Sequence, residues 1–510
     1  MNHGVLLEEL HKIDEECRYL EQGAAVLQWD QETYLPPGGV ADRAEQLALV
    51  QRLAHERFIA PETGRLLTEL GSDSQNPRGD EKLSPVEGDF CKVMRRRYDK
   101  AVKLPPAFVS DAARAEGLSQ AAWVQARRNN NFAAFLPHLK TMIGFARKRA
   151  RYWGFGKDVP GDEYDGLLDI YEPAMTARDI SLLFEPLRQG LIALLKRISA
   201  GPRQEHSFTD REYDVETQVR FNGALMDHLG FDRSRGRLDV SAHPFTTSLG
   251  SNDIRITTRY YPRNLLSGLF SVIHESGHAL YEMGFPPELR GTCLADGASM
   301  AIHESQSRFW ENVIGRSRPF WAGLFPLLQS YFPGPLGQVT AEDFYRGINQ
   351  VRPSYIRVEA DEVSYSLHII LRFELEKRLF SGELQPEELP ETWWKLMKEF
   401  LGVEPKTDAD GVLQDVHWSM GSFGYFPSYA LGNLYGLQFW KKLSADLPQT
   451  EQAISRGDFK DIHGWLRENI YRWGKRLDPP ELLRRVTGET LSVAPFLSYI
   501  ETKYTELYGL

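Results

Sequence analysis

Cysteine is scarce in this chain of 510 residues. The three cysteines, Cys17, Cys91 and Cys293, lie far apart in the sequence and are odd in number. A disulfide framework needs paired cysteines, and a thiolate metal knuckle needs closely spaced ones. The spacing is typical of neither, and it predicts a reducing compartment, which we take to be the cytoplasm.

Long hydrophobic runs are also missing. No stretch reaches the roughly 18 apolar residues that a membrane span requires. The nearest, LLFEPLRQGLIALLKRI (182–198), is interrupted by Glu185, Pro186, Arg188 and Gln189. The N-terminal stretch MNHGVLLEELHKIDEECRYLEQ is acidic and amphipathic, and it lacks the basic and apolar regions of a secretory signal. We therefore expect a soluble protein without a membrane partner.

The chain has no excess of positive charge. It carries 60 Lys and Arg against 70 Asp and Glu, a net charge of −10, which argues against nucleic acid as the main partner. The 42% apolar and 25% charged residues are an ordinary balance for a globular protein. Length alone would allow roughly two to four domains.

Most of the sequence has helical periodicity, so we predict a mainly α fold. One segment differs: in 253–258, isoleucines and a threonine alternate with polar residues, the period of a half-buried strand. The turn sequence LGSND precedes this strand, and LDVSAHPFTTS lies before the turn. The pattern predicts a small antiparallel β-hairpin directly before the next helix.

That helix is predicted to begin at Pro262 and to end at Gly284, and it contains HESGH at 274–278. His274 and His278 are four residues apart and therefore project from the same face. Two imidazoles so placed can hold one Zn²⁺ ion. Glu275, next to the first ligand, is placed to act as a general base on water rather than as a ligand.

A catalytic zinc needs a third protein ligand and one open position. The metzincin pattern would place this ligand at 284, which is Gly284 here, so that class is excluded. A second helix, predicted over 296–315, repeats the tetrapeptide IHES. We predict Glu304 as the third ligand. Adjacent residues diverge by about 100° on a helix, so His303 is an alternative to Glu304 rather than a companion, and Glu311 is the rival carboxylate.

The sequence resembles the carboxypeptidase Taq family of thermostable metallocarboxypeptidases. Six motifs occur in the order seen in that family: HPF (243–245), DIRIT (253–257), HESGH (274–278), HESQ (303–306), IRVEAD (356–361) and GVLQDVHW (411–418). The stretch YDGLLDIYEP (164–173) in the N-terminal half is also similar.

The resemblance implies removal of single amino acids from peptide C-termini with broad side-chain tolerance. It also implies Zn²⁺ or Co²⁺ as cofactor, often a homodimer, and a helical shell around a deep substrate groove. We predict a single metallopeptidase unit over 1–510, with an N-terminal helical part over about 1–235 and a catalytic part over about 236–510.

An enzyme that acts at a C-terminus must bind a carboxylate, and arginine is the planar, always charged donor for this task. The family motif points to Arg357, with Arg352 as an alternative. The competing structural interpretation pairs Arg357 with Glu359 or Asp361.

Aromatic and histidine side chains are candidates for a similar task. Tyr425 or Tyr429 is placed to donate a hydrogen bond to the carboxylate or to the developing oxyanion, and His417 has either an electrophilic or a structural role. His243 and the strand at 253–257 are candidates for pairing with an extended peptide through a strand edge. Asp253 and Arg255 on that strand are expected to be scaffold, as a cross-strand ion pair that holds the hairpin.

The sequence thus predicts a zinc-dependent carboxypeptidase. Two rival functions fit the same motifs: an endo-acting metallo-oligopeptidase and a peptide-binding pseudopeptidase without activity. The presence of the base, the ligands and an arginine disfavours the pseudopeptidase.

Overall fold

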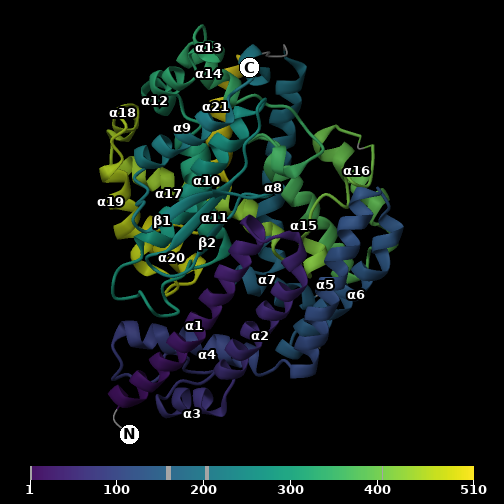
Figure 1. Ribbon diagram of the computed structural model, residues 1–510, viewed down its shortest axis with the longest axis vertical. Coiled ribbons are helices and arrows are strands. Elements are labelled where there is room, and N and C mark those ends of the chain that lie inside the picture. The colour runs from purple at the N-terminus through teal and green to yellow at the C-terminus, as the bar shows by residue number, and fades with distance from the viewer. Residues whose placement is uncertain (1–2, 157–161, 202–205, 405) are drawn as a thin grey trace.

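The computed structural model describes residues 3–156, 162–201, 206–404 and 406–510, and the mainly α prediction is confirmed (Figure 1). The first helices are α1 His3–Thr33, α2 Val40–Phe58, α3 Pro61–Glu69, α4 Pro85–Ala101, α5 Pro106–Arg128, α6 Phe132–Trp153, α7 Asp162–Tyr171, α8 Ala177–Ala200 and α9 Val215–His228. Three strands follow, β1 Gly236–Val240, β2 Thr246–Ser248 and β3 Ile254–Thr258. The later helices are α10 Leu265–Gly284, α11 Met300–Arg308, α12 Arg318–Tyr331, α13 Pro333–Leu336, α14 Ala341–Ile348, α15 Tyr365–Ser381, α16 Leu389–Leu401, α17 Phe426–Asp446, α18 Thr450–Ser455, α19 Lys460–Asn469, α20 Pro479–Thr487 and α21 Ala494–Tyr508.

The sheet is mixed rather than purely antiparallel. The predicted hairpin is present: β2 pairs with β3 in antiparallel register, with Thr246 opposite Ile256. However, β1 lies parallel on the other side of β3, with Gly236 opposite Ile254. Because β3 has a partner on both sides, the prediction that the strand at 253–257 offers a free edge is wrong. The two edges of the sheet belong to β1 and β2.

Helix α10 begins later than predicted and ends where predicted. Its N-cap is Asn264, whose side chain accepts a hydrogen bond from the backbone N–H of Ser267, so residues 262–264 precede the helix. The helix lies between β3, α9 and α11, and most of its residues are buried. A helix covered on several sides holds its side chains in fixed directions, which a metal site requires.

The helix predicted over 296–315 is shorter and irregular. It begins at its N-cap Ser299, and α11 gives way after Arg308 to a π-helical segment, Phe309–Ile314. Such turns contain one extra residue and are frequent at functional sites. Here the π-helical segment carries Glu311 to the side of His274.

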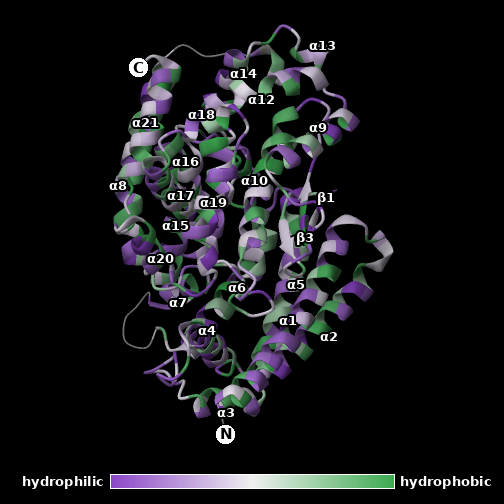
Figure 2. Cartoon of the chain, turned by 90° about the vertical axis from the view of Figure 1, so that its left-hand side faces the viewer, coloured by the Kyte–Doolittle hydropathy of each residue, from purple (hydrophilic) through white to green (hydrophobic). Residues whose placement is uncertain are grey.

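Two hydrophobic cores hold these elements in place. The larger core draws on residues from Trp123 to Leu507, and the smaller one joins the N-terminal helices to Leu289, Cys293 and Leu294 in the connection between α10 and α11. Along α1 and α2, hydrophobic (green) residues are interspersed with hydrophilic (purple) ones (Figure 2), as expected for helices that are covered on one side only. In the described parts of the chain, no helix combines the length and apolar character needed to cross a membrane.

Candidate metal centre

Three side chains from α10 and α11 converge on one point. The Nε2 atoms of His274 and His278 lie 3.7 and 3.5 Å from Oε2 of Glu304, and one ligand atom from each residue lies within 4.8 Å of the other two. Among the described residues, this is the group of histidine, cysteine and acidic side chains that could hold a metal ion. Two nitrogens and one oxygen are a donor set that suits a tetrahedral Zn²⁺ with one position left open.

Two glycines allow the close helix contacts that create this geometry. A Cβ atom on Gly277 in α10 would lie 2.7 Å from the backbone of Ser307 in α11. A Cβ atom on Gly432 in α17 would lie 2.7 Å from the Cβ of Glu304. Any larger residue at either position would push α11 away from its neighbours and carry Glu304 with it.

The two rival ligands occupy the outer sides of the imidazoles. Oε2 of Glu311 lies 2.8 Å from Nδ1 of His274, and Nδ1 of His303 lies 2.6 Å from Nδ1 of His278. Neither residue is in the converging group. Both instead contact the ring nitrogen that faces away from it, the position from which a partner fixes the orientation of a metal-binding histidine.

Arg308 holds the other oxygen of Glu304. Its Nε donates to Glu304 Oε1 at 2.7 Å, and its Nη1 donates to Glu311 at 3.1 Å. Burial by itself would raise the pKa of Glu304, but Arg308 and the two histidines outweigh it and hold that pKa well below its usual range. In the same way Arg308 and His274 lower the pKa of Glu311 to about 2 against the effect of burial. Both carboxylates are therefore ionised.

Glu275 lies beside the converging group and outside it. Its Oε2 accepts a hydrogen bond of 2.6 Å from the hydroxyl of Thr246 in the edge strand β2. The side chain is 6% exposed, and burial raises its pKa above the ordinary value. A buried carboxylate with a raised pKa has the basicity that proton transfer from water requires.

A second group of predicted residues surrounds Arg357. The guanidinium of Arg357 pairs with Asp415 at 2.8 Å, and Arg372 pairs with the other oxygen of Asp415 at 2.6 Å. The competing prediction that Arg357 pairs with Glu359 or Asp361 is therefore wrong. Two buried guanidinium groups share one carboxylate, which leaves a surplus of positive charge.

Two tyrosine side chains and one histidine side chain lie next to the guanidinium of Arg357. The ring of Tyr429 lies 5.0 Å from the guanidinium of Arg357, and its hydroxyl is 3.2 Å from Nε2 of His417. Tyr425 packs against both, with ring centroids 5.1 and 5.4 Å away. Burial lowers the pKa of His417 to about 3, so the ring is neutral.

Tyr365 connects the two groups. Its ring lies 4.1 Å from the guanidinium of Arg308, and its hydroxyl accepts a hydrogen bond of 3.5 Å from Nη1 of Arg357. The side chain of Tyr365 thus joins the cluster around Arg357 to Arg308, the residue that binds Glu304.

His243 and Arg352 are separate from both groups. Both side chains are exposed, and in the described part of the chain no hydrogen bond or ion pair joins them to the converging group or to Arg357. Arg255 in β3 binds Asp253 at 2.8 Å, so the expected ion pair is present. Asp253 directly precedes β3, and the pair therefore does not cross between strands as expected.

Glu282 lies 2.7 Å from Nε2 of His303. It and several other residues of the site were missed from the sequence: Thr246, Arg308, Tyr365, Arg372 and Asp415. Two of them carry a signal. Arg308 is four residues after Glu304, the spacing of a helical ion pair, and Asp415 lies inside the GVLQDVHW motif. The others are recognisable only through contacts between distant segments.

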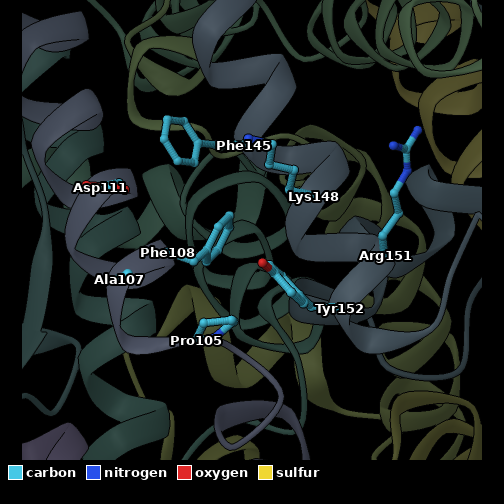
Figure 3. A pocket seen from close by; sticks show the side chains of 8 residues that line it. All are labelled: Pro105, Ala107, Phe108, Asp111, Phe145, Lys148, Arg151 and Tyr152. Atoms are coloured by element: carbon cyan, nitrogen blue, oxygen red, sulfur yellow. The ribbon is translucent and has the colours of Figure 1, made fainter.

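A surface cavity of about 550 Å³ lies elsewhere, between α5 and α6 (Figure 3). In that view the rings of Phe108 and Tyr152 lie side by side, with centroids 5.1 Å apart. None of the predicted site residues lines it.

Comparison with known proteins agrees with this architecture. The family model of the carboxypeptidase Taq (M32) metallopeptidases matches residues 9–504. The chain is 44% identical to thermostable carboxypeptidase 1 of Thermus thermophilus, over 98% of this chain and 99% of that protein, and 38% identical to carboxypeptidase 1 of Bacillus subtilis, over 96% of each. The crystal structure of the M32 carboxypeptidase from Deinococcus radiodurans superposes with a TM-score of 0.94 at 38% identity, covering 99% of this chain and 100% of that one.

The fold and the converging histidine and glutamate side chains fit a metal-dependent peptide hydrolase. The chain belongs to the carboxypeptidase Taq (M32) metallopeptidase family. It is therefore a metallocarboxypeptidase that acts on peptides, and the family implies a divalent metal ion.

Proposed function

We propose that this protein is a zinc-dependent carboxypeptidase that releases single C-terminal amino acids with broad side-chain specificity. His274, His278 and Glu304 hold the ion, with Co²⁺ as an alternative to Zn²⁺. The observation that carries the proposal is the convergence of the two Nε2 atoms on Oε2 of Glu304 at 3.7 and 3.5 Å.

The residues present fit such an ion. Glu311 is ionised and accepts a hydrogen bond from the Nδ1–H group of His274. The lone pair of Nε2 in His274 therefore faces Glu304 and His278. Glu304 likewise has one oxygen occupied by Arg308 and the other turned toward the histidines. Each ligand is thus held from outside before any ion binds.

Proton transfer falls to Glu275. When bound, the ion supplies Lewis acidity, which polarises the scissile carbonyl and lowers the pKa of water. The Glu275 carboxylate takes a proton from the attacking water and later passes it to the amine of the leaving amino acid. Thr246 orients the carboxylate through its hydrogen bond of 2.6 Å to Oε2.

The substrate carboxylate is proposed to bind at Arg357. The surplus charge of Arg357 and Arg372 around Asp415 attracts an anion. Tyr425, Tyr429 and the neutral His417 supply hydrogen-bonding groups next to it. Arg352 remains the alternative, although its side chain is exposed, and His243 lies before β2, where an extended peptide has an edge strand to follow.

Glu275→Gln separates the base from the ligands. The variant should retain one equivalent of zinc and lose nearly all turnover, whereas His274→Ala and Glu304→Ala should lose the metal. Near-normal turnover in Glu275→Gln would contradict the role of the base. Stoichiometric metal in Glu304→Ala would contradict the ligand set.

Digestion of one peptide with a free and an amidated C-terminus tests the direction of cleavage. A carboxypeptidase releases single residues from the free acid and fails on the amide, as mass spectrometry of the products shows. An endo-acting oligopeptidase cleaves both peptides internally, and a pseudopeptidase cleaves neither.

We also propose a cytoplasmic homodimer, in line with the three free and buried cysteines and with the family resemblance. Sedimentation of the purified protein tests the dimer.

A further inference from the structure

We infer that Glu172, in the N-terminal stretch YDGLLDIYEP, is a positioning residue that holds α11 against α17 and thereby sets the place of Glu304. The inference rests on the proposed role of Glu304 as a metal ligand. It gives a task to the one similar stretch of the N-terminal half that the catalytic proposal leaves unused.

One oxygen of Glu172 binds two helices at once. Its Oε1 accepts a hydrogen bond of 2.6 Å from the backbone N–H of Ala301 and one of 2.7 Å from the hydroxyl of Ser428. Ala301 lies in the first turn of α11, and Ser428 lies in the first turn of α17. The Glu172 side chain is fully buried, with 0% exposure, so no water replaces it at these donors.

Both attachment points lie one helical turn from the contact that places the ligand. Glu304 is three residues after Ala301 on α11. Gly432, on which Glu304 packs, is four residues after Ser428 on α17. A shift of either helix start therefore moves the two residues that press together at the ligand.

Helix α11 depends on this anchor because it is short. It has nine residues, and its first-turn N–H groups need acceptors that the helix's own i−4 carbonyls do not supply. Ser299 accepts from Ile302, and Glu172 accepts from Ala301. The partial negative charge on the Glu172 oxygen at the N-terminus of α11 also interacts favourably with the helix dipole.

The same stretch supplies a matched control at its other end. The hydroxyl of Tyr164 donates to the buried carboxylate of Glu376 at 2.8 Å. Glu376 in turn accepts from Trp418 and from the backbone of Gly424. This second anchor holds the loop that carries His417 and Tyr425, and among the described residues none of these hydrogen bonds reaches α11.

The test is zinc affinity, measured on metal-free protein by competition with a chromogenic chelator. Glu172→Leu removes the acceptor and should weaken zinc binding by about tenfold or more, the usual loss when a group that orients a ligand is removed. Glu172→Gln retains the acceptor oxygen and should remain within about threefold of the wild type. Ser428→Ala should weaken binding by less than Glu172→Leu.

Tyr164→Phe should leave zinc affinity unchanged, since Tyr164 binds Glu376, which holds the loop at Trp418 and Gly424 and not the start of α11. Wild-type affinity in folded Glu172→Leu would overturn the inference, as would equal losses in Glu172→Gln and Glu172→Leu. A loss in Tyr164→Phe as large as that in Glu172→Leu would show general loosening and would also overturn it. If Glu172→Leu fails to fold, unchanged affinity in Ser428→Ala decides against the inference.

Glu304→Gln, measured in the same series, separates this inference from the proposed function. Wild-type zinc affinity in Glu304→Gln would remove the ligand assignment itself. Loss of zinc in Glu304→Gln together with full affinity in Glu172→Leu would leave the ligand assignment in place and overturn the positioning role alone.

Discussion

The Nδ1 atoms of His278 and His303 lie 2.6 Å apart, and the other ring nitrogen of His303 is 2.7 Å from Glu282. A carboxylate only accepts, so we assign the Nε2 hydrogen of His303 to its bond with Glu282. In neutral His303, Nδ1 is then an acceptor, and Nδ1 of His278 must donate to it. The lone pair on Nε2 of His278 is thereby left facing Glu304.

Replacing Glu282 tests this relay. The amide of Glu282→Gln can donate to His303 and reverse both tautomers, which would place a hydrogen on Nε2 of His278. We expect zinc affinity to fall by about 10-fold to 100-fold, as measured by chelator competition. Glu288→Gln, at an exposed position after α10, is the control and should bind zinc as the wild type does. Equal affinities in the two variants would refute the relay.

Arg308→Met tests the clamp on the two buried carboxylates. Because Glu304 and Glu311 would lose their shared cation, we expect the free energy of unfolding of the metal-free protein to drop by about 3 kcal/mol. Arg52→Met is the matched control, since Arg52 pairs with Glu56 at the same helical spacing but on the surface. That pair should contribute at most about 0.5 kcal/mol. Urea unfolding in the presence of EDTA measures both, and similar losses would contradict the prediction.

Arg357→Gln tests recognition of the substrate terminus. Losing a buried charged partner for a carboxylate costs about 2–5 kcal/mol, so kcat/KM for a peptide with a free C-terminus should fall by at least about thirtyfold. Arg352→Gln should remain close to the wild type, because its side chain is exposed. A larger loss in Arg352→Gln than in Arg357→Gln would transfer the role to Arg352.

Glu172 makes stability depend on pH. Burial raises its pKa to about 7 in the folded protein, against about 4.3 in an unfolded chain. Between these values the folded state binds more protons, so the contribution of Glu172 to the unfolding free energy is complete below pH 4.3 and is lost as the pH rises through 7. At about 1.36 kcal/mol per pKa unit, the shift from about 4.3 to about 7 corresponds to a loss of about 4 kcal/mol. Glu172→Gln should remove it, and parallel pH profiles for the two proteins would contradict this.

Patterns within single segments predicted much of this molecule. The four-residue spacing of His274 and His278 places both imidazoles on one face only if the segment is a helix. The apolar periodicity of 265–284 predicts that helix. The alternation in 253–258 likewise indicated a strand, and Ile254 and Ile256 are both fully buried. The division of the chain near residue 235 is still a prediction.

Contacts between distant segments could not be predicted from the sequence. The pairing of Arg357 with Asp415 spans 58 residues, and the nearer acids, Glu359 and Asp361, were the wrong partners. The parallel strand β1 also escaped, because hairpin chemistry predicts only the antiparallel neighbour across a short turn.

By itself, the sequence determined the chemical groups of this protein and their local geometry: two histidines one helical turn apart, a carboxylate between them, and a second acid on a later helix. Local geometry follows from the helical repeat, which every residue obeys regardless of its neighbours in space. Only the tertiary structure decided that Glu304 turns inward while Glu311 and His303 support the imidazoles from outside. That choice depends on the close approach of α10, α11 and α17 at Gly277 and Gly432 and on the π-helical segment after Arg308. These are packing outcomes, and many weak contacts fix them together.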